Sequence, residues 1–352
     1  MPLRPRTRWT MDRIALAAPA VVLPRHALAA GLADAPMNYV VTHGLQGRAV
    51  TPLLWGLGAI SVAVVVIISL LVVVGTLRRR APRMHLPSDG QMPVERPEGG
   101  LSWIAIGVGV STVVLLGMMG WTATTMARIA RPPTQPALTI DIRAQQWWWA
   151  VRYESGDPTR ILDTANEIHI PVGKPVEFKL ESRDVIHSFW VPALGGKTDV
   201  IPGQTNMAWL QAERPGVYRG QCAEYCGQQH GHMGLVIVAE PPDQFEAWMA
   251  NQLASAKTAD NGPVRAGQDD FVQRCGICHA VRGTLAHGVL GPDLTHLMSR
   301  GSIAAATLPN RVAYLSGWIA NPQTIKPGAR MPTLDISGPE LARIRGFLET
   351  LK

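Results

Sequence analysis

Cysteine is scarce in this sequence, with four among 352 residues. The four form two close pairs, Cys222 with Cys226 and Cys275 with Cys278, and none lies near the N-terminus, where a lipid anchor would need one. An exported domain would normally use such residues for disulfides, yet both pairs lie beside other donor residues. If both pairs serve those neighbouring donor groups, no thiol remains for a structural disulfide.

Charge is absent from two long apolar runs, residues 53–77 and 101–127. Each run exceeds the roughly 20 apolar residues that a helix needs to cross a bilayer. Two buried helices of a soluble core are the alternative, but core helices of this length usually keep a polar stripe. We therefore expect a two-helix transmembrane hairpin within residues 31–131, in contact with membrane lipid.

Basic residues lie at the N-terminus and between the two apolar runs, in a loop that begins with three consecutive arginines. Short Arg-rich loops stay in the cytoplasm, so we expect both termini and the C-terminal domains on the periplasmic side of a bacterial inner membrane. This topology accounts for much of the formal charge of +7, and nucleic acid is not an expected partner.

Residues 1–30 have the order of a secretory signal peptide: a basic region, a short apolar stretch and small residues around Ala27 and Ala29. Pro19, Pro24 and Arg25 interrupt the apolar stretch. An uncleaved N-terminal arm is therefore the alternative.

Residues 132–240 contain seven segments with strand character, separated by Gly, Pro, Asp and Asn turns. So many short strands in so short a region predict a β-sandwich or a Greek-key barrel.

The stretch QCAEYCGQQHGHM concentrates soft donor atoms: Cys222, Cys226, His230 and Met233, with His187 in RDVIHSFWVP as a fifth donor. Thiolate and imidazole suit copper or zinc, whereas a thioether suits soft copper and is a poor zinc ligand. Two cysteines four residues apart could bridge two copper ions, with a histidine terminal on each. A zinc site and a disulfide between the two cysteines are the alternatives.

HSFWVP, GGKTDVIPGQ and CAEYCGQQHGHM together resemble subunit II of haem–copper cytochrome c oxidases, over most of residues 40–240. The resemblance implies a cupredoxin-like Greek-key β-barrel with a binuclear copper-A centre. In that centre Cys222 and Cys226 would bridge the coppers and His187 and His230 would be terminal ligands, with Met233 a weak ligand to one copper and the Glu224 carbonyl a ligand to the other. The Glu224 side chain would reach a magnesium site shared with subunit I.

The same resemblance assigns roles to residues around the centre. Trp147, first in a run of three tryptophans, would lie over the copper as the residue where electrons arrive; packing is the alternative. Asp184, Lys197 and Asp199 also fall on family motif positions, and ordinary surface charge is their alternative. His232 is expected to be a solvent-exposed loop residue.

Residues 241–262 begin as a helix and end as a linker, and residues 263–352 change from strand to helix character. This last region contains C-G-I-C-H, the attachment motif of c-type haem, in which Cys275 and Cys278 bind the vinyl groups and His279 ligates the iron. A redox disulfide or half of a zinc site could use the same two cysteines. The adjacent histidine and the exported location favour haem.

Residues 264–352 resemble small class I cytochromes c, which implies an all-α domain with Met331 as the sixth iron ligand. Met298 and His296 are the competitors, and Met298 is expected to pack in the core. Pro292 stands where that family has a proline that positions the proximal histidine. The last stretch, from residue 338, has apolar residues at helical spacing and predicts a terminal helix.

Together these features predict a multidomain membrane protein: an enzyme subunit that accepts electrons at haem c and passes them to copper-A and then to haem in subunit I. By resemblance, subunit I would reduce dioxygen to water with proton translocation. Subunit III, and an upstream cytochrome c or quinol–cytochrome c reductase, are the other expected partners. A quinol oxidase subunit would lack the copper ligands. A membrane-anchored carrier serving another terminal reductase is the alternative.

Two glutamates precede the second apolar run, Glu95 and Glu98. The family often has a glutamate here that opens a proton path in subunit I. The local pattern does not align cleanly, and solvated loop charges are the alternative.

Overall fold

The computed structural model describes residues 37–78, 100–258 and 260–352. The expected signal peptide, the Arg-rich loop beyond Arg78, and Glu95 and Glu98 lie outside the described residues.

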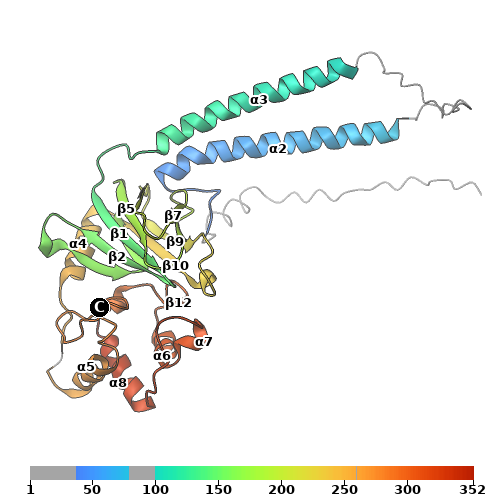
Figure 1. The fold of residues 1–352 in the computed structure, drawn as a ribbon. Coiled ribbons are helices and arrows are strands. Elements are labelled where there is room, and N and C mark those ends of the chain that lie inside the picture. Colours follow the sequence, from blue (N-terminus) through green and yellow to red (C-terminus); the bar gives the residue numbers. More distant parts are fainter. Residues whose placement is uncertain (1–36, 79–99, 259) are drawn as a thin grey trace, which may run out of the picture. The chain divides into compact units, whose positions relative to one another are not determined.

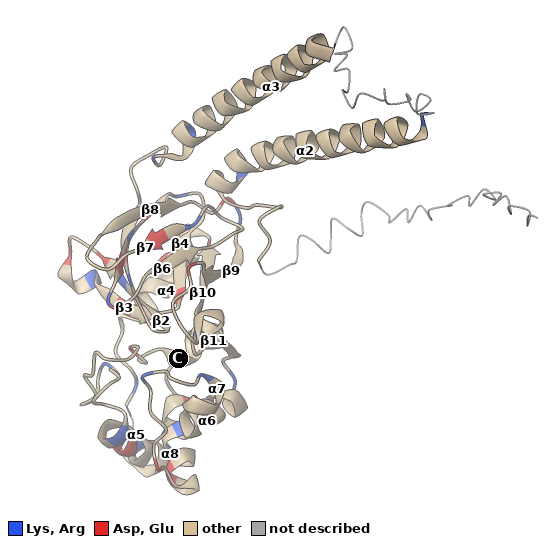
Figure 2. Ribbon diagram, turned by 45° about the vertical axis from the view of Figure 1, so that its right-hand side comes forward, with Lys and Arg blue, Asp and Glu red and all other residues tan. Residues whose placement is uncertain are grey.

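Two long helices carry the apolar runs: α2 (Leu45–Leu77) and α3 (Gly100–Ile129). Both are long and apolar enough to cross a membrane, and the most apolar stretch of each has no buried residue in the protein. Figure 2 shows charged residues only near their ends. At 1.5 Å per residue, a 30-residue helix such as α3 extends about 45 Å, more than the ~30 Å hydrocarbon core of a bilayer. The two helices are therefore candidate membrane spans.

Both helices are tied to the β-domain at one end. Before α2, His43 N donates to Ala193 O at 2.7 Å, and Glu213 N donates to His43 O at 2.8 Å. After α3, Trp209 Nε1 donates to Ile129 O at 2.9 Å. The apolar hairpin therefore joins the β-domain through backbone-mediated contacts as well as through the chain itself.

Residues 138–240 form two five-stranded sheets (Figure 1). One sheet has the order β3 (Leu162–Ala165), β2 (Trp148–Glu154), β1 (Leu138–Gln145), β5 (Val176–Ser182), β8 (Asn206–Leu210). The other has the order β4 (Glu167–Pro171), β10 (Gly234–Glu240), β9 (Gly216–Cys222), β6 (His187–Trp190), β7 (Thr198–Val200). The pairs β1/β5 and β4/β10 are parallel, and the others are antiparallel. The predicted β-sandwich is confirmed.

Alternating apolar residues fill the space between the sheets. Ile140 and Ile142 of β1 and Phe178 of β5 are fully buried, and Phe178 packs on Phe189 of β6 with ring centroids 5.2 Å apart. Alternation of this kind buries one face of each strand and leaves the other to solvent.

The strand number differs from the expectation of seven. The described residues of this domain form ten strands, because the first predicted segment is the β1/β2 hairpin and because β3 and β7 were missed. Both missed strands are short and contain polar residues, LDTA and TDV, so they give little apolar signal.

The C-terminal region is helical, with α4 (Pro242–Leu253), α5 (Gly262–Arg274), α6 (Val312–Ala320), α7 (Pro322–Ile325) and α8 (Gly338–Leu348). Its described residues also form one pair of two-residue strands, β11 (Ser302–Ile303) and β12 (Leu308–Pro309). The described part of the chain also contains three short 3₁₀ turns: η1 (Pro158–Arg160), η2 (His230–His232) and η3 (Leu297–Ser299). Helix α8 buries Ile344, Phe347 and Leu348, and Phe347 packs on Phe271 of α5 at 5.5 Å.

Phe178→Ala should lower the free energy of unfolding of the β-sandwich by about 3–5 kcal/mol, because it removes a fully buried ring and leaves a cavity. Denaturant titration of the detergent-solubilised chain, followed by circular dichroism, measures the change. Val217→Ala on β9 is the control, because its side chain is 72% exposed and should cost little. Equal losses in the two variants would contradict the assignment of Phe178 to the core.

Candidate metal centre

The pairing of β6 with β9 brings distant donor residues together. Phe189 of β6 lies opposite Cys222, the last residue of β9, so His187 at the start of β6 lies near the same sheet end. The loop after β9 contains Cys226, then His230 in η2, then Met233 immediately before β10. All five donors predicted from the sequence therefore gather where β6, β9 and β10 meet.

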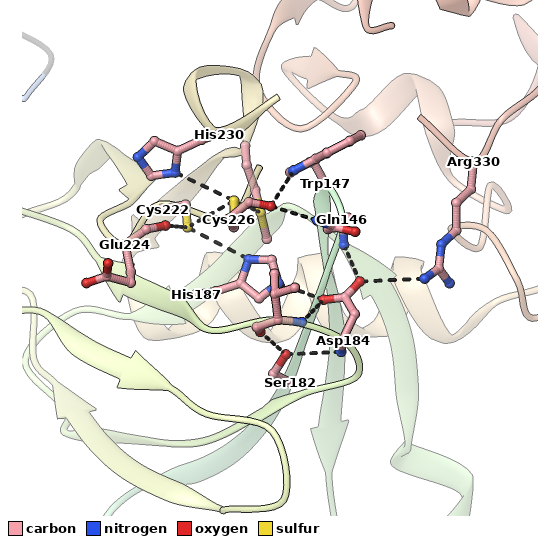
Figure 3. Close-up of polar contacts among 12 residues, drawn as sticks. Gln146, Trp147, Ser182, Asp184, His187, Cys222, Glu224, Cys226, His230 and Arg330 are labelled. Carbon is pink, nitrogen blue, oxygen red and sulfur yellow. Dashed lines mark hydrogen bonds and ion pairs between the residues drawn. The ribbon is translucent and has the colours of Figure 1, made fainter. Parts of the chain in front are cut away.

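The donor atoms lie close together (Figure 3). The sulfur atoms of Cys222 and Cys226 are 3.8 Å apart. His187 Nδ1 lies 3.9 Å from Cys222 Sγ, while His230 Nδ1 lies 3.6 Å and Met233 Sδ 3.8 Å from Cys226 Sγ. Each cysteine thus faces one imidazole.

Glu224 offers its backbone rather than its side chain to the cluster. Its carbonyl oxygen lies 3.2 Å from Cys222 Sγ. Figure 3 shows its carboxylate pointing away from the sulfur atoms.

Burial and mutual contact set the charge of the sulfur pair. Both cysteines are buried, at 1% and 2% exposure. The hydrogen bond from Cys226 lowers the pKa of Cys222, and the same contact raises the pKa of Cys226. The pair therefore favours a thiolate at Cys222, and the thiolate is the form that binds metal.

The Asp184 carboxylate orients the His187 imidazole. The ring Nε2–H of His187 donates to Asp184 Oδ1 at 2.8 Å, since a carboxylate can only accept. This fixes the tautomer with a bare Nδ1 facing the sulfur. Burial lowers the pKa of His187, but its contacts with Cys222 and Asp184 outweigh burial and raise it overall.

The Asp184 carboxylate is itself well supported. Its oxygens accept hydrogen bonds from Gln146 N and Val185 N, each at 2.8 Å. Burial alone would raise the pKa of Asp184, but these hydrogen bonds and His187 lower it, so the group stays ionised at neutral pH.

Trp147 lies against the cluster, in the turn between β1 and β2. Its indole Nε1–H donates to Cys226 O at 3.0 Å, and Gln146 Nε2 donates to the same oxygen at 2.8 Å. Trp147 is 8% exposed. A second tryptophan, Trp149, meets His187 edge to face, with ring centroids 6.1 Å apart.

The remaining candidates lie at the periphery. Lys197 and Asp199 form an exposed ion pair with each other at 3.5 Å. His232 is exposed, as expected, and its Nδ1 lies 2.7 Å from Gln229 Oε1. Asp184 is the secondary candidate that contacts a donor.

The donor set distinguishes between the alternatives drawn from the sequence. A disulfide needs sulfur atoms about 2.05 Å apart, and the Cys222–Cys226 separation is 3.8 Å. Zinc would leave the buried thioether of Met233 without a role, whereas copper binds thiolate, imidazole and thioether together. The residues present therefore fit copper.

The C-G-I-C-H motif follows α5, and its histidine is fixed by a backbone carbonyl. His279 Nδ1–H donates to Pro292 O at 2.8 Å, which leaves Nε2 free to bind iron. Gly291 permits this approach, because a Cβ there would lie 2.6 Å from the imidazole. Burial lowers the pKa of His279, which favours the neutral ring.

The candidates for a second axial ligand differ in their surroundings. Both ring nitrogens of His296 lie near backbone carbonyls, Lys352 O at 2.6 Å and Ala254 O at 3.0 Å, so neither is free. Met298 packs on the core of the helical region. Met331 is half-buried in the loop between α7 and α8.

Sequence reasoning missed several contacts. Trp149 and Gln146 belong to the tryptophan-rich segment that drew attention for Trp147 alone. Lys326, whose Nζ donates to Trp147 O at 2.6 Å, gave no signal, because nothing in K-P-G-A-R-M marks the lysine as buried.

Comparison with known proteins gave consistent matches. The family model for the periplasmic domain of cytochrome c oxidase subunit II matches residues 154–240. Cytochrome c oxidase subunit 2 of Alkalihalophilus pseudofirmus (strain ATCC BAA-2126 / JCM 17055 / OF4) is 33% identical over 300 residues, 83% of each chain. The protein of the same name from Bacillus sp. (strain PS3) is 33% identical over 204 residues, 55% of this chain and 56% of that one.

A solved structure also matches part of the chain. It is the periplasmic domain of subunit II of cytochrome oxidase from Bradyrhizobium japonicum, 30% identical with a TM-score of 0.32. The match covers 34% of this chain and 95% of that chain.

Asp184→Asn should weaken copper binding by about tenfold to a hundredfold, because the amide no longer fixes the His187 tautomer as a carboxylate does. Competition titration of the apo-chain against a copper chelator measures the affinity. Asp163→Asn, an exposed acidic residue of β3, is the matched control. The supporting role of Asp184 is wrong if both variants bind copper as tightly as the unaltered chain.

Proposed function

This chain belongs to the cytochrome c oxidase subunit II family, and we propose that it is the electron-input subunit of its haem–copper oxidase and carries its own haem c domain. Membership makes it part of an oxygen-reducing enzyme and implies a subunit I partner. The observation that carries the proposal is the cluster of five donor side chains, all buried except the half-buried His230, in which the two cysteine sulfur atoms are 3.8 Å apart.

The cluster would hold a binuclear copper-A centre. Cys222 and Cys226 would bridge the coppers, with His187 and His230 as terminal ligands. Met233 would be the weak ligand to one copper, and the Glu224 carbonyl would serve the other. The support is that every one of these donors turns toward the sulfur pair.

Residues 263–352 would form a class I cytochrome c domain. Cys275 and Cys278 would bind the haem covalently, His279 would ligate the iron through Nε2, and Met331 would be the sixth ligand. The Nδ1 bond from His279 to Pro292 O supports this assignment, because it orients the ring and leaves Nε2 bare. When bound, a haem at this site would supply one-electron redox chemistry.

Two residues of the chain would act on either side of the copper centre, one where the electron enters and one at the contact with subunit I. Trp147 would lie on the path into the copper centre, and its indole bond to Cys226 O supports that role. The outward-pointing Glu224 side chain would reach magnesium at the contact with subunit I. Subunit III, and an upstream cytochrome c or quinol–cytochrome c reductase, would complete the set of partners.

The expected organisation remains part of the proposal: a signal peptide over 1–30, a membrane hairpin within 31–131, a copper domain over 132–240 and a linker over 241–262. The two candidate spans and the family's periplasmic domain support anchoring with an extracytoplasmic C-terminal part. The chain would lie in a bacterial inner membrane, with both termini on the periplasmic side. A carrier serving another reductase is not favoured, because the 83% coverage of a subunit 2 relative extends beyond the copper domain.

Substitutions within one cysteine pair should affect the cofactor of that pair only. Cys222→Ser should abolish binuclear copper and leave covalent haem, because it removes a bridging thiolate. Cys275→Ala with Cys278→Ala should abolish covalent haem and leave two coppers per chain. Elemental analysis and haem staining of the purified full chain measure both. Zinc, or a single copper, in the unaltered chain would overturn the copper-A assignment.

Met331→Leu should change the haem spectrum and lower the reduction potential of the haem, because a thioether ligand raises that potential. Met298→Leu is the matched control and should leave both unchanged, since Met298 packs in the core. Spectral redox titration compares them. If the effects are reversed, Met298 is the ligand instead.

A further inference from the structure

A buried lysine joins the helical region to the copper domain. Lys326 is 3% exposed, although it follows the short surface helix α7. Its Nζ donates to Trp147 O at 2.6 Å and to Ala304 O at 3.2 Å. One amine therefore links the loop after α7 both to the tryptophan beside the copper ligands and to the segment between β11 and β12.

Burying this amine has an energetic cost that its partners must offset. Lysine is rarely fully buried unless paired, because an ammonium group loses its hydration. Burial lowers the pKa of Lys326 to about 7, and Cys226 opposes that shift only in part. Either protonation state of the amine can still donate to both carbonyls, so the contact survives loss of the charge.

The loop that Lys326 begins is internally braced. Gln323 Nε2 donates to Ala329 O at 2.7 Å and to Met331 O at 2.6 Å, and Gly328 N donates to Gln323 Oε1 at 2.8 Å. Fixing Lys326 therefore also fixes the backbone of Met331.

The braced loop lies directly on the indole of Trp147. A Cβ on Gly328 would lie 3.5 Å from Trp147 Cη2, so the loop backbone passes close to the ring and has room for no more than a small side chain there. Gln229 Nε2, from the ligand loop of the copper domain, donates to Pro327 O at 2.9 Å. Figure 3 shows the nearby Asp184 bonded to both His187 and Arg330, but that Arg330 pair, at 3.6 Å with an exposed guanidinium, should contribute little.

Further backbone hydrogen bonds cross the same boundary. Gly301 N donates to Glu167 Oε2 at 2.8 Å, and Gly234 N donates to Ala305 O at 3.0 Å. Both amide hydrogens are bonded across the boundary, so their exchange with solvent reports on its opening.

We propose that Lys326 is a positioning residue that clamps the loop carrying Met331 onto Trp147, so that the copper centre receives electrons from the chain's own haem rather than from a carrier docked at Trp147. The inference rests on the proposed function. It goes further in two ways. It names a residue that helps to hold the two domains together, and it proposes that this chain's own loop, rather than a separate carrier, lies next to Trp147.

Lys326→Met in the full chain tests the clamp, because it keeps the buried stem and removes both hydrogen bonds. Hydrogen exchange at Gly301 and Gly234 should become about tenfold faster, because the variant loses both hydrogen bonds of the Lys326 amine. Exchange at Val236, whose N–H donates to Asn166 O within the copper domain, should not change. This measurement is made on the purified full chain with its cofactors bound.

Electron transfer provides the second readout. In the loaded variant, transfer from haem to copper should slow, while reduction of copper by a small-molecule reductant and the copper absorption spectrum should stay as in the unaltered chain. Lys257→Met, at an exposed position before α5, is the matched control for loss of a lysine. Lys326→Gln keeps a shorter donor and should give an intermediate opening, which guards against a variant that fails to fold.

The two proposals can fail separately. An unaltered chain without two coppers and one covalent haem would overturn the proposed function. A chain that holds both cofactors, but whose Lys326→Met variant matches the unaltered chain in exchange and in haem-to-copper transfer, would overturn the clamp.

Discussion

The close approach of two buried sulfur atoms is the constraint around which the copper domain is organised. At 3.8 Å, with little solvent near them, Cys222 and Cys226 favour sharing a negative charge. Such a pair is costly unless the surrounding groups favour a bound cation or donate hydrogen bonds. The imidazoles of His187 and His230, the thioether of Met233 and the carbonyl of Glu224 turn toward it from separate positions along the chain.

The strands and turns around the cluster fix the positions of these donors. The β6/β9 ladder fixes the separation between His187 and Cys222, and the Asp184 carboxylate orients the imidazole. Two side-chain donors, from Gln146 and Trp147, tie down the backbone at Cys226. Asp184, Gln146 and Trp147 lie in turns that connect strands of the sheets, so the sheets position these supporting residues around the donors.

In the proposed haem attachment region, fewer contacts orient the candidate iron ligand. One carbonyl, Pro292 O, sets the tautomer of His279, and a glycine beside the ring allows the loop to reach it. The loop of Met331 is held by Gln323 within the helical region and by Lys326 outside it. The two proposed redox sites thus share Trp147 as a common neighbour, one through its indole and the other through its backbone carbonyl.

Much of this protein is determined locally by its sequence. The uncharged runs form long apolar helices, and the alternation of apolar and polar residues produces the β-sandwich. The closely spaced cysteine, histidine and methionine residues, with the motifs around them, predict which side chains meet. The short polar strands β3 and β7 were missed because pairing partners, rather than their own composition, make them strands. Only the tertiary structure decided that Trp149 meets His187 and that Lys326 is buried against Trp147. The spacing within a motif fixes which donors can meet, but whether a lysine is solvated or buried depends on the packing of segments far apart in the chain.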